Sequence, residues 1–302
     1  MGKQYEVYDN RFLALLNPDS RLEWLCGGAR WAEGPVYFAE GDYLIFSDIK
    51  NNRMLRWSDK EGMSVYRAPA NYSNGNYRDL QGRMLTCSHG ARALQRTEND
   101  GTIVTLVDRY NGARLNSPND LVVKSDGTIW FTDPPYGIIQ PEEGYFADSE
   151  QPGNYVFRFD PQTNELTAVV EDMDKPNGLA FSPDERILYV ADSGLSHNPN
   201  GNHHIRAYDV IGGRRVTNGR VFAVIDPFVP DGFRLDIHGY IYTSSADSIQ
   251  VYDPAGELLG KIMVPEVIAN CTFGGPQKNR LFIAATSSIY AITLNTRGIQ
   301  QP

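Results

Sequence analysis

The stretch of sequence that decides the fold is residues 118–133, which read PNDLVVKSDGTIWFTD. Two short apolar runs flank the turn residues Ser-Asp-Gly, and this order predicts a β-hairpin. The same order of polar start, apolar run, turn and second apolar run occurs five more times. The other copies are residues 33–48, 77–90, 176–192, 230–245 and 270–286. An internal repeat of this kind indicates an architecture built from repeated β units.

Further strands follow the hairpins, for example in residues 155–172 (YVFRFDPQTNELTAVVED) and 248–264 (SIQVYDPAGELLGKIMV). Four strands in each of six units predict an all-β, six-bladed β-propeller that occupies residues 1–302 as a single domain. The chain has no long stretch with a 3.6-residue period, which argues against a TIM barrel. Within the N-terminal segment of about residues 1–30, residues 21–26 (RLEWLC) belong to no copy. We expect this segment to complete the sixth blade, because closure of the ring removes two exposed sheet edges.

Composition and charge exclude several classes of partner. The 302 residues include 28 Lys and Arg and 37 Asp and Glu, for a formal net charge of −9. An acidic chain repels phosphate backbones and anionic membranes, so neither nucleic acid nor a membrane is an expected partner. No apolar stretch reaches the roughly 18 residues that span a bilayer, and the N-terminus does not resemble a secretory signal. The widely spaced cysteines Cys26, Cys87 and Cys271 are expected to be buried apolar residues in a reducing, cytoplasmic setting.

A polar residue stands at the start of the first strand in five copies: Glu33, Asn119, Asn177, Asp231 and Asn270. The first strand of each blade lines the central channel, so these residues should ring one mouth of it. Carboxylate and amide oxygens are ligands for Ca²⁺, Mg²⁺ or Mn²⁺, whereas zinc more usually draws on Cys and His. The alternative is that the Asn and Asp residues only serve the turns. Their shared phase, and the presence of Glu33, which is not a favoured turn residue, favour a cation site.

The loops after the second strands return to the same mouth. The two longest are residues 134–153 and 193–204, and long loops in compact domains often bind ligands. His89 also follows a second strand, so we expect it to point into the pocket.

Other polar residues near this mouth have simpler expected roles. Asp48, Asp133 and Asp192 end second strands, and we expect each to accept backbone N–H bonds from the loop that follows. In the second long loop, His203 and His204 are expected to be solvated, and the same interpretation applies to His197. His238, in a turn at the opposite face, is expected to have no functional role.

Six motifs together resemble the SMP-30/gluconolactonase/luciferin-regenerating family, closest to its bacterial gluconolactonase-like branch, over about residues 33–286. They are WAEGP at 31–35, NSPND at 116–120, FTDPPYG at 131–137, KPNGLAFSPD at 175–184, PDG at 230–232 and NCTFGG at 270–275. The resemblance implies a six-bladed propeller with one divalent cation in the channel mouth, and lactone hydrolysis as the best-known activity.

By motif match, the resemblance assigns the metal ligands to Glu33, Asn177 and Asp231, and a contact with substrate or a metal-bound water to Asn119. Animal members of the family carry a substrate-binding Arg where this chain has Ser117. His89, Arg92 or Tyr136 could supply the missing polar contact, and the sequence leaves these alternatives open.

These observations predict a metal-dependent hydrolase that opens a sugar lactone. Asp231 is the candidate general base as well as a metal ligand, and Asn119, His89 and Tyr136 are candidates for substrate contacts. The cofactor is expected to be one divalent cation, Ca²⁺ first, with Mg²⁺, Mn²⁺ and Zn²⁺ as alternatives. No G-x-S-x-G motif is present, which argues against a serine hydrolase. Two alternatives stay open: a metal-dependent esterase acting on an aryl ester or organophosphate, and a non-catalytic propeller that binds a sugar-like ligand or a protein.

Overall fold

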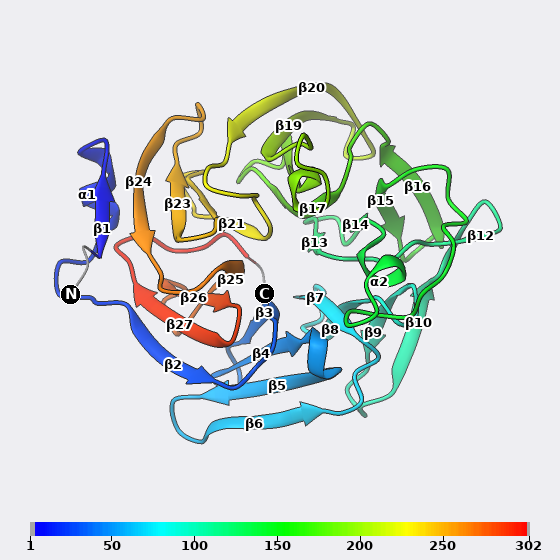
Figure 1. The fold of residues 1–302 in the computed structure, drawn as a ribbon, viewed down its shortest axis with the longest axis horizontal. Helices are drawn as coiled ribbons and strands as arrows, with labels where there is room; N and C mark the ends of the chain where they lie inside the picture. The colour runs from blue at the N-terminus through cyan, green and yellow to red at the C-terminus, as the bar shows by residue number, and fades with distance from the viewer. Residues whose placement is uncertain (1–3, 301–302) are drawn as a thin grey trace.

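Six antiparallel sheets surround a central channel in the computed structural model, which describes residues 4–300 (Figure 1). Each sheet is one blade, and within a blade the strands follow one another in chain order from the channel outward, except that an N-terminal strand is added at the outer edge of two blades. This arrangement confirms the predicted six-bladed β-propeller with four strands as the basic blade.

The first three blades contain the strands β3 to β10 and β13 to β16. Blade 1 consists of β3 (Ala32–Phe38), β4 (Tyr43–Asp48), β5 (Arg53–Ser58) and β6 (Gly62–Arg67). Blade 2 consists of β7 (Ser73–Arg78), β8 (Met84–Ser88), β9 (Ala93–Thr97) and β10 (Ile103–Val107). Blade 3 consists of β13 (Leu121–Val123), β14 (Ile129–Asp133), β15 (Tyr155–Asp160) and β16 (Glu165–Val170), preceded by the short ribbon of β11 (Arg109–Tyr110) and β12 (Ala113–Arg114).

The last three blades continue the same order around the channel. Blade 4 consists of β17 (Pro176–Phe181), β18 (Ile187–Asp192), β19 (His204–Ile211) and β20 (Arg215–Val224). Blade 5 consists of β21 (Phe233–Leu235), β22 (Ile241–Thr243), β23 (Ser248–Tyr252) and β24 (Leu258–Met263). Blade 6 contains β25 (Ile268–Gly274), β26 (Arg280–Ala285) and β27 (Ser288–Thr293). Short helices lie outside the blades: α1 (Arg11–Leu15), α2 (Tyr136–Ile139), η1 (Ile49–Asn51) and η2 (Gly194–Ser196).

An N-terminal strand closes the ring, as predicted. Strand β2 (Glu23–Gly27) pairs antiparallel with β27 as the outermost strand of blade 6, and its bounds lie one or two residues beyond the predicted 21–26 (Figure 1). A second strand, β1 (Tyr5–Val7), adds a fifth strand to blade 5 by pairing with β24. The sequence did not predict β1, because three residues are too few to show an alternating pattern.

Burial falls from the second strand of a blade to its edge. All five residues of β14 are buried, since neighbouring blades cover both faces of the sheet there, whereas β6 is exposed at five of its six positions. This difference explains why the second strands read as continuous apolar runs and not as a strict alternation. Apolar clusters join successive blades, and one of them, which includes Trp57 and Phe282, joins blade 6 to blade 1.

The second repeat begins earlier than predicted. We expected its hairpin to start at Tyr77, but β7 begins at Ser73, so that Asn74 takes the place equivalent to Glu33 in blade 1. The polar run Ser-Asn-Gly-Asn at 73–76 hides this strand, because it carries no apolar residue and no preceding Pro.

The three cysteines have the state that the sequence analysis predicts. Cys26, Cys87 and Cys271 are buried and free, as predicted. In residues 4–300, no helix has the length and apolar character needed to cross a membrane.

We predict that removal of residues 1–27, which deletes β1, α1 and β2, destabilises the propeller more than removal of residues 1–8, which deletes β1 alone. Loss of α1 removes the buried Phe12 and Leu15, and loss of β2 uncovers the edge of β27 and exposes the apolar cluster that Cys26 joins. We expect the longer deletion to cost about 3 kcal/mol more in the free energy of unfolding. Urea unfolding and size-exclusion chromatography check this, and equal stability of the two shortened chains would contradict it.

Candidate metal and substrate site

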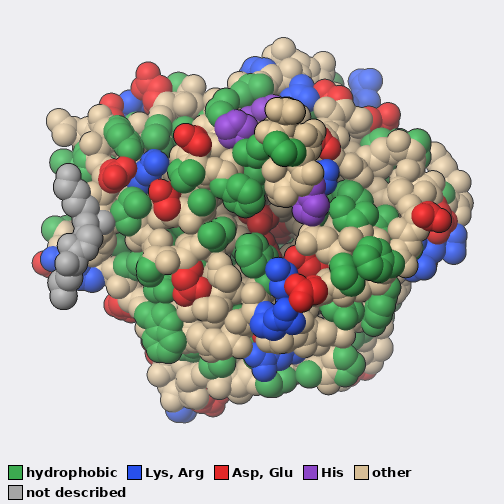
Figure 2. Space-filling view, in the orientation of Figure 1, with side chains coloured by type: hydrophobic (Ala, Val, Ile, Leu, Met, Phe, Trp, Pro, Cys, Tyr) green, Lys and Arg blue, Asp and Glu red, His purple; other side chains and the backbone are tan. Residues whose placement is uncertain are grey.

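Polar side chains from five blades line one cavity at the mouth of the channel. Its volume is ≈ 210 Å³, and its walls include the residues that stand at or just before five inner strands: Glu33, Asn74, Asn119, Asn177 and Asp231. Figure 2 shows a central hollow on this face, with acidic side chains on its floor. The structure therefore brings together four of the five predicted ring residues and adds Asn74.

Glycines after these residues let adjacent blades approach closely. The N–H of Gly178 donates to the carbonyl oxygen of Asp231 at 3.0 Å, and a Cβ on Gly178 would stand 2.4 Å from that oxygen. In the same way, the N–H of Gly75 donates to the carbonyl oxygen of Asn119 at 2.8 Å. The repeated N-G dipeptide thus has a packing reason, which also places the preceding side chains side by side.

Buried aspartates at the ends of second strands fix the chain just before the ring residues. Asp48 accepts from the N–H of Arg30 at 2.8 Å, Asp133 from Asn116 at 2.8 Å, and Asp192 from Lys175 at 2.9 Å. Their structural role is as predicted, but the main donors belong to the segment that enters the same blade and not to the loop that follows. Each of these bonds positions a ring residue two or three places further along the chain.

Asn270, the fifth predicted ring residue, does not line the cavity. Its Nδ2 donates to Oε2 of Glu33 at 3.1 Å and to Oδ2 of Asp120 at 3.2 Å, and its Oδ1 accepts from the N–H of Cys271 at 2.9 Å. Asn270 therefore lies deeper in the channel and links two carboxylates.

Glu33 and Asp231, two of the three carboxylates that line the cavity, are poorly solvated and close enough to repel each other. Burial raises the pKa of Glu33 to about 8, with a further increase from Asp120, while the N–H of Gly34 and the side chain of Asn270 oppose the shift. Enclosure also raises the pKa of Asp231 well above its ordinary value, and the negative charges of Glu33, Asp120 and Glu143 raise it further. A positive charge in the cavity would stabilise both ionised carboxylates.

The donor atoms of the cavity fit a hard divalent cation. Glu33, Asn177 and Asp231 offer oxygen ligands at one place, and Oδ1 of the neighbouring Asn74 is buried with no hydrogen-bond partner. Among residues 4–300, no group of three or more His, Cys, Asp or Glu side chains is arranged to hold a metal ion, so the amide oxygens are necessary members of this set.

His89 lies behind the wall of the cavity, contrary to the expectation that it points into it. The side chain is 1% exposed, with Nε2 3.0 Å from Nδ2 of Asn74 and Nδ1 3.0 Å from the carbonyl oxygen of Glu143. Burial lowers its pKa to about 4. His89 thus contacts one wall residue, Asn74, and does not reach the space that a substrate would occupy.

Tyr136 lines the cavity, as expected, and Ser117 hydrogen-bonds to the backbone on both sides of it. The Oγ of Ser117 donates to the carbonyl oxygen of Pro134 at 2.6 Å and accepts from the N–H of Gly137 at 2.9 Å. These bonds secure the start of α2, which carries Tyr136, whose hydroxyl lies 3.3 Å from Oγ of Ser196. Ser117, which stands where animal members of the family have Arg, therefore stabilises the start of loop 134–153.

Both long loops reach the cavity, as the topology predicted. Loop 134–153 contributes Gln140 and Glu143, and loop 193–204 contributes Ser193, Ser196 and His197. His197 is exposed, as expected, and it also lines the cavity, with Nδ1 2.9 Å from Oγ of Ser196.

The remaining basic candidates lie elsewhere. His204 is the first residue of β19, His203 precedes it, and both are partly buried, so neither is a fully solvated loop residue. His238 is exposed in the turn of blade 5. Arg92 donates through Nε to the carbonyl oxygen of Leu115 at 2.7 Å and does not line the cavity.

Lys50 lines the cavity, and the sequence analysis did not identify it. It is the only Lys or Arg among the described cavity residues, and its Nζ lies 3.9 Å from Oε1 of Glu143 and 5.0 Å from the ring centroid of Trp31. Burial raises the pKa of Glu143, and Lys50 opposes the shift. Its position directly after β4, where the same topological argument applies, could have identified it.

Part of the cavity wall is apolar, with Trp31, Ile49, Phe228 and Val229 among the lining residues. A concave pocket of this kind, with a few converging polar groups, is typical of a small-molecule site. Fold and site together define a six-bladed propeller with an oxygen-rich, enclosed pocket at one mouth of its channel.

Comparison with known proteins identifies the family. Residues 31–287 match the model of the SMP-30/Gluconolactonase/LRE-like region, and the chain belongs to this family. It is 30% identical over 312 residues to a gluconolactonase of Zymomonas mobilis, with 96% of this chain and 86% of that protein covered. A solved gluconolactonase of Xanthomonas campestris superposes with a TM-score of 0.90 at 39% identity, over 97% of this chain and 95% of the other. A calcium-binding regucalcin of Agrobacterium tumefaciens has the same fold, with a TM-score of 0.74 at 16% identity over 92% and 95% of the two chains.

We predict that H89Q makes the stability of the protein less sensitive to acid. The pKa of His89 is about 4 in the folded protein and ordinarily near 6.5, so its contribution to stability is complete above pH 6.5 and is lost as the pH falls toward 4. The loss in the wild type is on the order of 3 kcal/mol.

Urea unfolding between pH 4 and 7 tests this prediction. H238Q, at an exposed histidine, serves as the matched control and should follow the wild type. The prediction fails if H89Q and H238Q lose stability in parallel with the wild type as the pH falls.

Proposed function

We propose that this protein hydrolyses lactones, with a sugar lactone as the first candidate substrate. The observation that carries the proposal is the meeting of Glu33, Asn177 and Asp231 with Asn119 in one cavity. The gluconolactonases of Zymomonas mobilis and Xanthomonas campestris, which match nearly the whole chain, support the same activity.

The proposed cofactor is one divalent cation, Ca²⁺ first, held by Glu33, Asn177 and Asp231. A purely oxygen donor set favours Ca²⁺ over Zn²⁺ and leaves Mg²⁺ and Mn²⁺ as the alternatives. When bound, such an ion polarises a carbonyl oxygen, stabilises negative charge that develops on it, and acidifies water.

Asp231 is the proposed general base. Only the ionised carboxylate can accept a proton, and a cation held beside Asp231 would keep it ionised against the effects of its enclosure and of the nearby Glu33 and Asp120. In the proposed reaction it takes a proton from the attacking water. Asn119 and the Tyr136 hydroxyl hold the ring oxygens and hydroxyl groups of the substrate.

Lys50 is proposed to supply the polar contact that the family's missing Arg would make. The support is its place in the cavity wall and the absence of His89 and Arg92 from the described lining residues. An ammonium group donates up to three hydrogen bonds, which suits a substrate with several hydroxyl groups.

The apolar wall supports a second candidate substrate class. Trp31, Ile49, Phe228 and Val229 would pack against an alkyl or aryl group, so a non-sugar lactone or aryl ester is the alternative. A panel of sugar lactones, alkyl lactones, aryl esters and an organophosphate, each assayed with Ca²⁺, Mg²⁺, Mn²⁺ and Zn²⁺, separates the two classes.

We predict that D231N lowers kcat for lactone hydrolysis at least about a hundredfold, because the amide can neither accept the proton nor balance a cation. D209N, which changes an exposed aspartate in an ion pair with Arg220, is the matched control and should retain activity. The measurement is acid release in a pH-stat, corrected for spontaneous hydrolysis, with circular dichroism to verify folding. Full activity of D231N, or of a wild-type sample stripped of metal, would refute the mechanism.

We predict that K50M raises KM for a hydroxylated sugar lactone roughly tenfold while kcat changes little, as expected when a hydrogen bond from a charged group is lost in both ground and transition states. For an unsubstituted alkyl lactone, KM should stay the same. K60M, at an exposed position, is the control. A uniform rise in KM for both substrates would show that Lys50 does not contact the hydroxyl groups.

A further inference from the structure

The channel beneath the cavity contains a buried arginine. Arg234, on β21, is 3% exposed, and its Nη1 donates to the carbonyl oxygen of Phe233 at 2.8 Å and lies 3.4 Å from Oδ2 of Asp120. The guanidinium also lies 5.7 Å from the ring centroid of Tyr77. Its Nε and Nη2 are buried without a hydrogen-bond partner.

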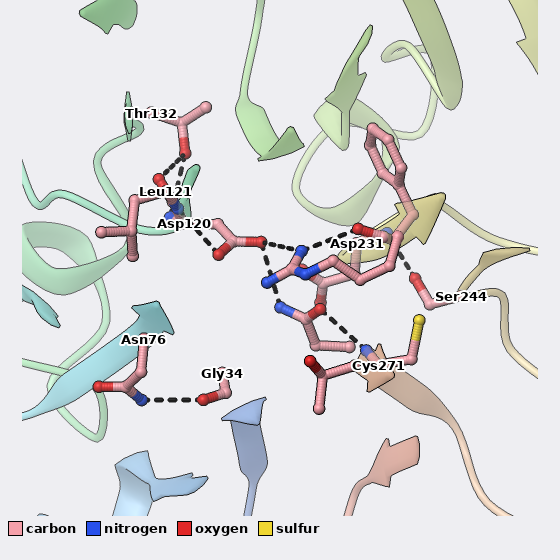
Figure 3. A network of polar contacts seen from close by, with 12 residues as sticks. Gly34, Asn76, Asp120, Leu121, Thr132, Asp231, Ser244 and Cys271 are labelled. Atoms are coloured by element: carbon pink, nitrogen blue, oxygen red, sulfur yellow. Dashed lines mark hydrogen bonds and ion pairs between the residues drawn. The ribbon is translucent and has the colours of Figure 1, made fainter. Parts of the chain in front are cut away.

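A continuous set of contacts connects Arg234 to the proposed metal site. Oδ2 of Asp120 lies near Arg234 and accepts from Nδ2 of Asn270, which also donates to Glu33 at 3.1 Å. Figure 3 shows the Asp120 carboxylate pointing into the channel, in the direction of Asp231. Two side chains, the carboxylate of Asp120 and the amide of Asn270, therefore connect the arginine to the proposed metal ligand Glu33.

The charges of this region balance only when Arg234 is counted. Glu33, Asp120, Asp231 and Glu143 carry four negative charges when ionised, and each of the other three raises the pKa of Asp231. Lys50, which lies beside Glu143, and Arg234 carry two positive charges, which leaves a net charge of −2, the charge that one divalent cation neutralises. Without Arg234, the net charge would be −3, and the channel floor would attract additional cations.

We propose that Arg234 is a fixed internal cation that takes the place of a second metal ion in the channel and limits the site to a single divalent cation. The proposal rests on the proposed metal site and assigns Arg234 the role of a positioning residue, since it contacts Asp120 and not the cavity. The same positive charge also weakens the attraction of the site for its divalent ion, which provides a direct test.

The test is Ca²⁺ binding by isothermal titration calorimetry, on protein treated with EDTA and then dialysed. R234M, which keeps an unbranched side chain without the charge, should bind Ca²⁺ about tenfold more tightly than the wild type or bind a second ion. D120N removes one negative charge from the same pair and should bind Ca²⁺ more weakly. Opposite effects from the two partners of one contact distinguish charge from structural damage, which would weaken binding in both variants.

Two controls separate this effect from the general cost of removing a buried arginine. R158M removes another buried arginine, which pairs with Asp160 on β15, and should leave Ca²⁺ affinity unchanged. R234K retains the charge and should bind one ion with nearly wild-type affinity. If R234M is too unstable for calorimetry, the increase in Tm on addition of Ca²⁺ replaces it, and this increase should be larger for R234M than for the wild type.

The outcomes are distinguishable from failure of the proposed function. A wild type that binds no divalent cation overturns the metal site itself. A wild type that binds one ion, together with an R234M variant of the same affinity, stoichiometry and Ca²⁺-induced shift in Tm, overturns the role of Arg234 and leaves the metal site intact.

Discussion

The site depends on the enclosure of two carboxylates, Glu33 and Asp231, at one mouth of the channel. They come from blades 1 and 5, and both have raised pKa values because they are poorly hydrated and lie near other negative charge. Folding brings them together at a cost, since buried like charges repel. A bound cation would offset this cost by attracting both carboxylates, and the same attraction would contribute to the affinity for the ion. The net charge at the channel mouth therefore affects both the stability of the fold and the chemistry of the site.

The propeller provides the means to enclose these groups. Inner strands of adjacent blades touch at glycines such as Gly178, and the buried aspartates Asp48, Asp133 and Asp192 fix the chain before the ring residues. Arg234 then supplies a permanent positive charge below the cavity. The position of each ring residue thus depends on the backbone of the neighbouring blade, as Asn177 depends on the contact between Gly178 and Asp231.

Repeated local patterns in the sequence made the blades and most of the ring residues predictable. Hairpins such as residues 118–133 indicated the blades, and the shared phase of Glu33, Asn119, Asn177 and Asp231 placed them at one mouth, where the structure has them. The residues that sequence reasoning missed lack a local pattern. Asn74 lies in a strand without the apolar residues that identify strands in a sequence. Lys50 follows a strand, a position at which a lysine is usually solvated.

The sequence by itself determined the six-bladed fold, the closing strand and the polar ring, because alternation, turn residues and repeat phase are local properties of the chain. Only the tertiary structure decided which side chains face the cavity. His89 and Asn270 were expected there but lie behind or below it, while His197 and Lys50 line it. The physical reason is that the orientation of these side chains follows from contacts between blades far apart in the sequence, such as those of Asn270 with Glu33 and Asp120, which no local pattern records.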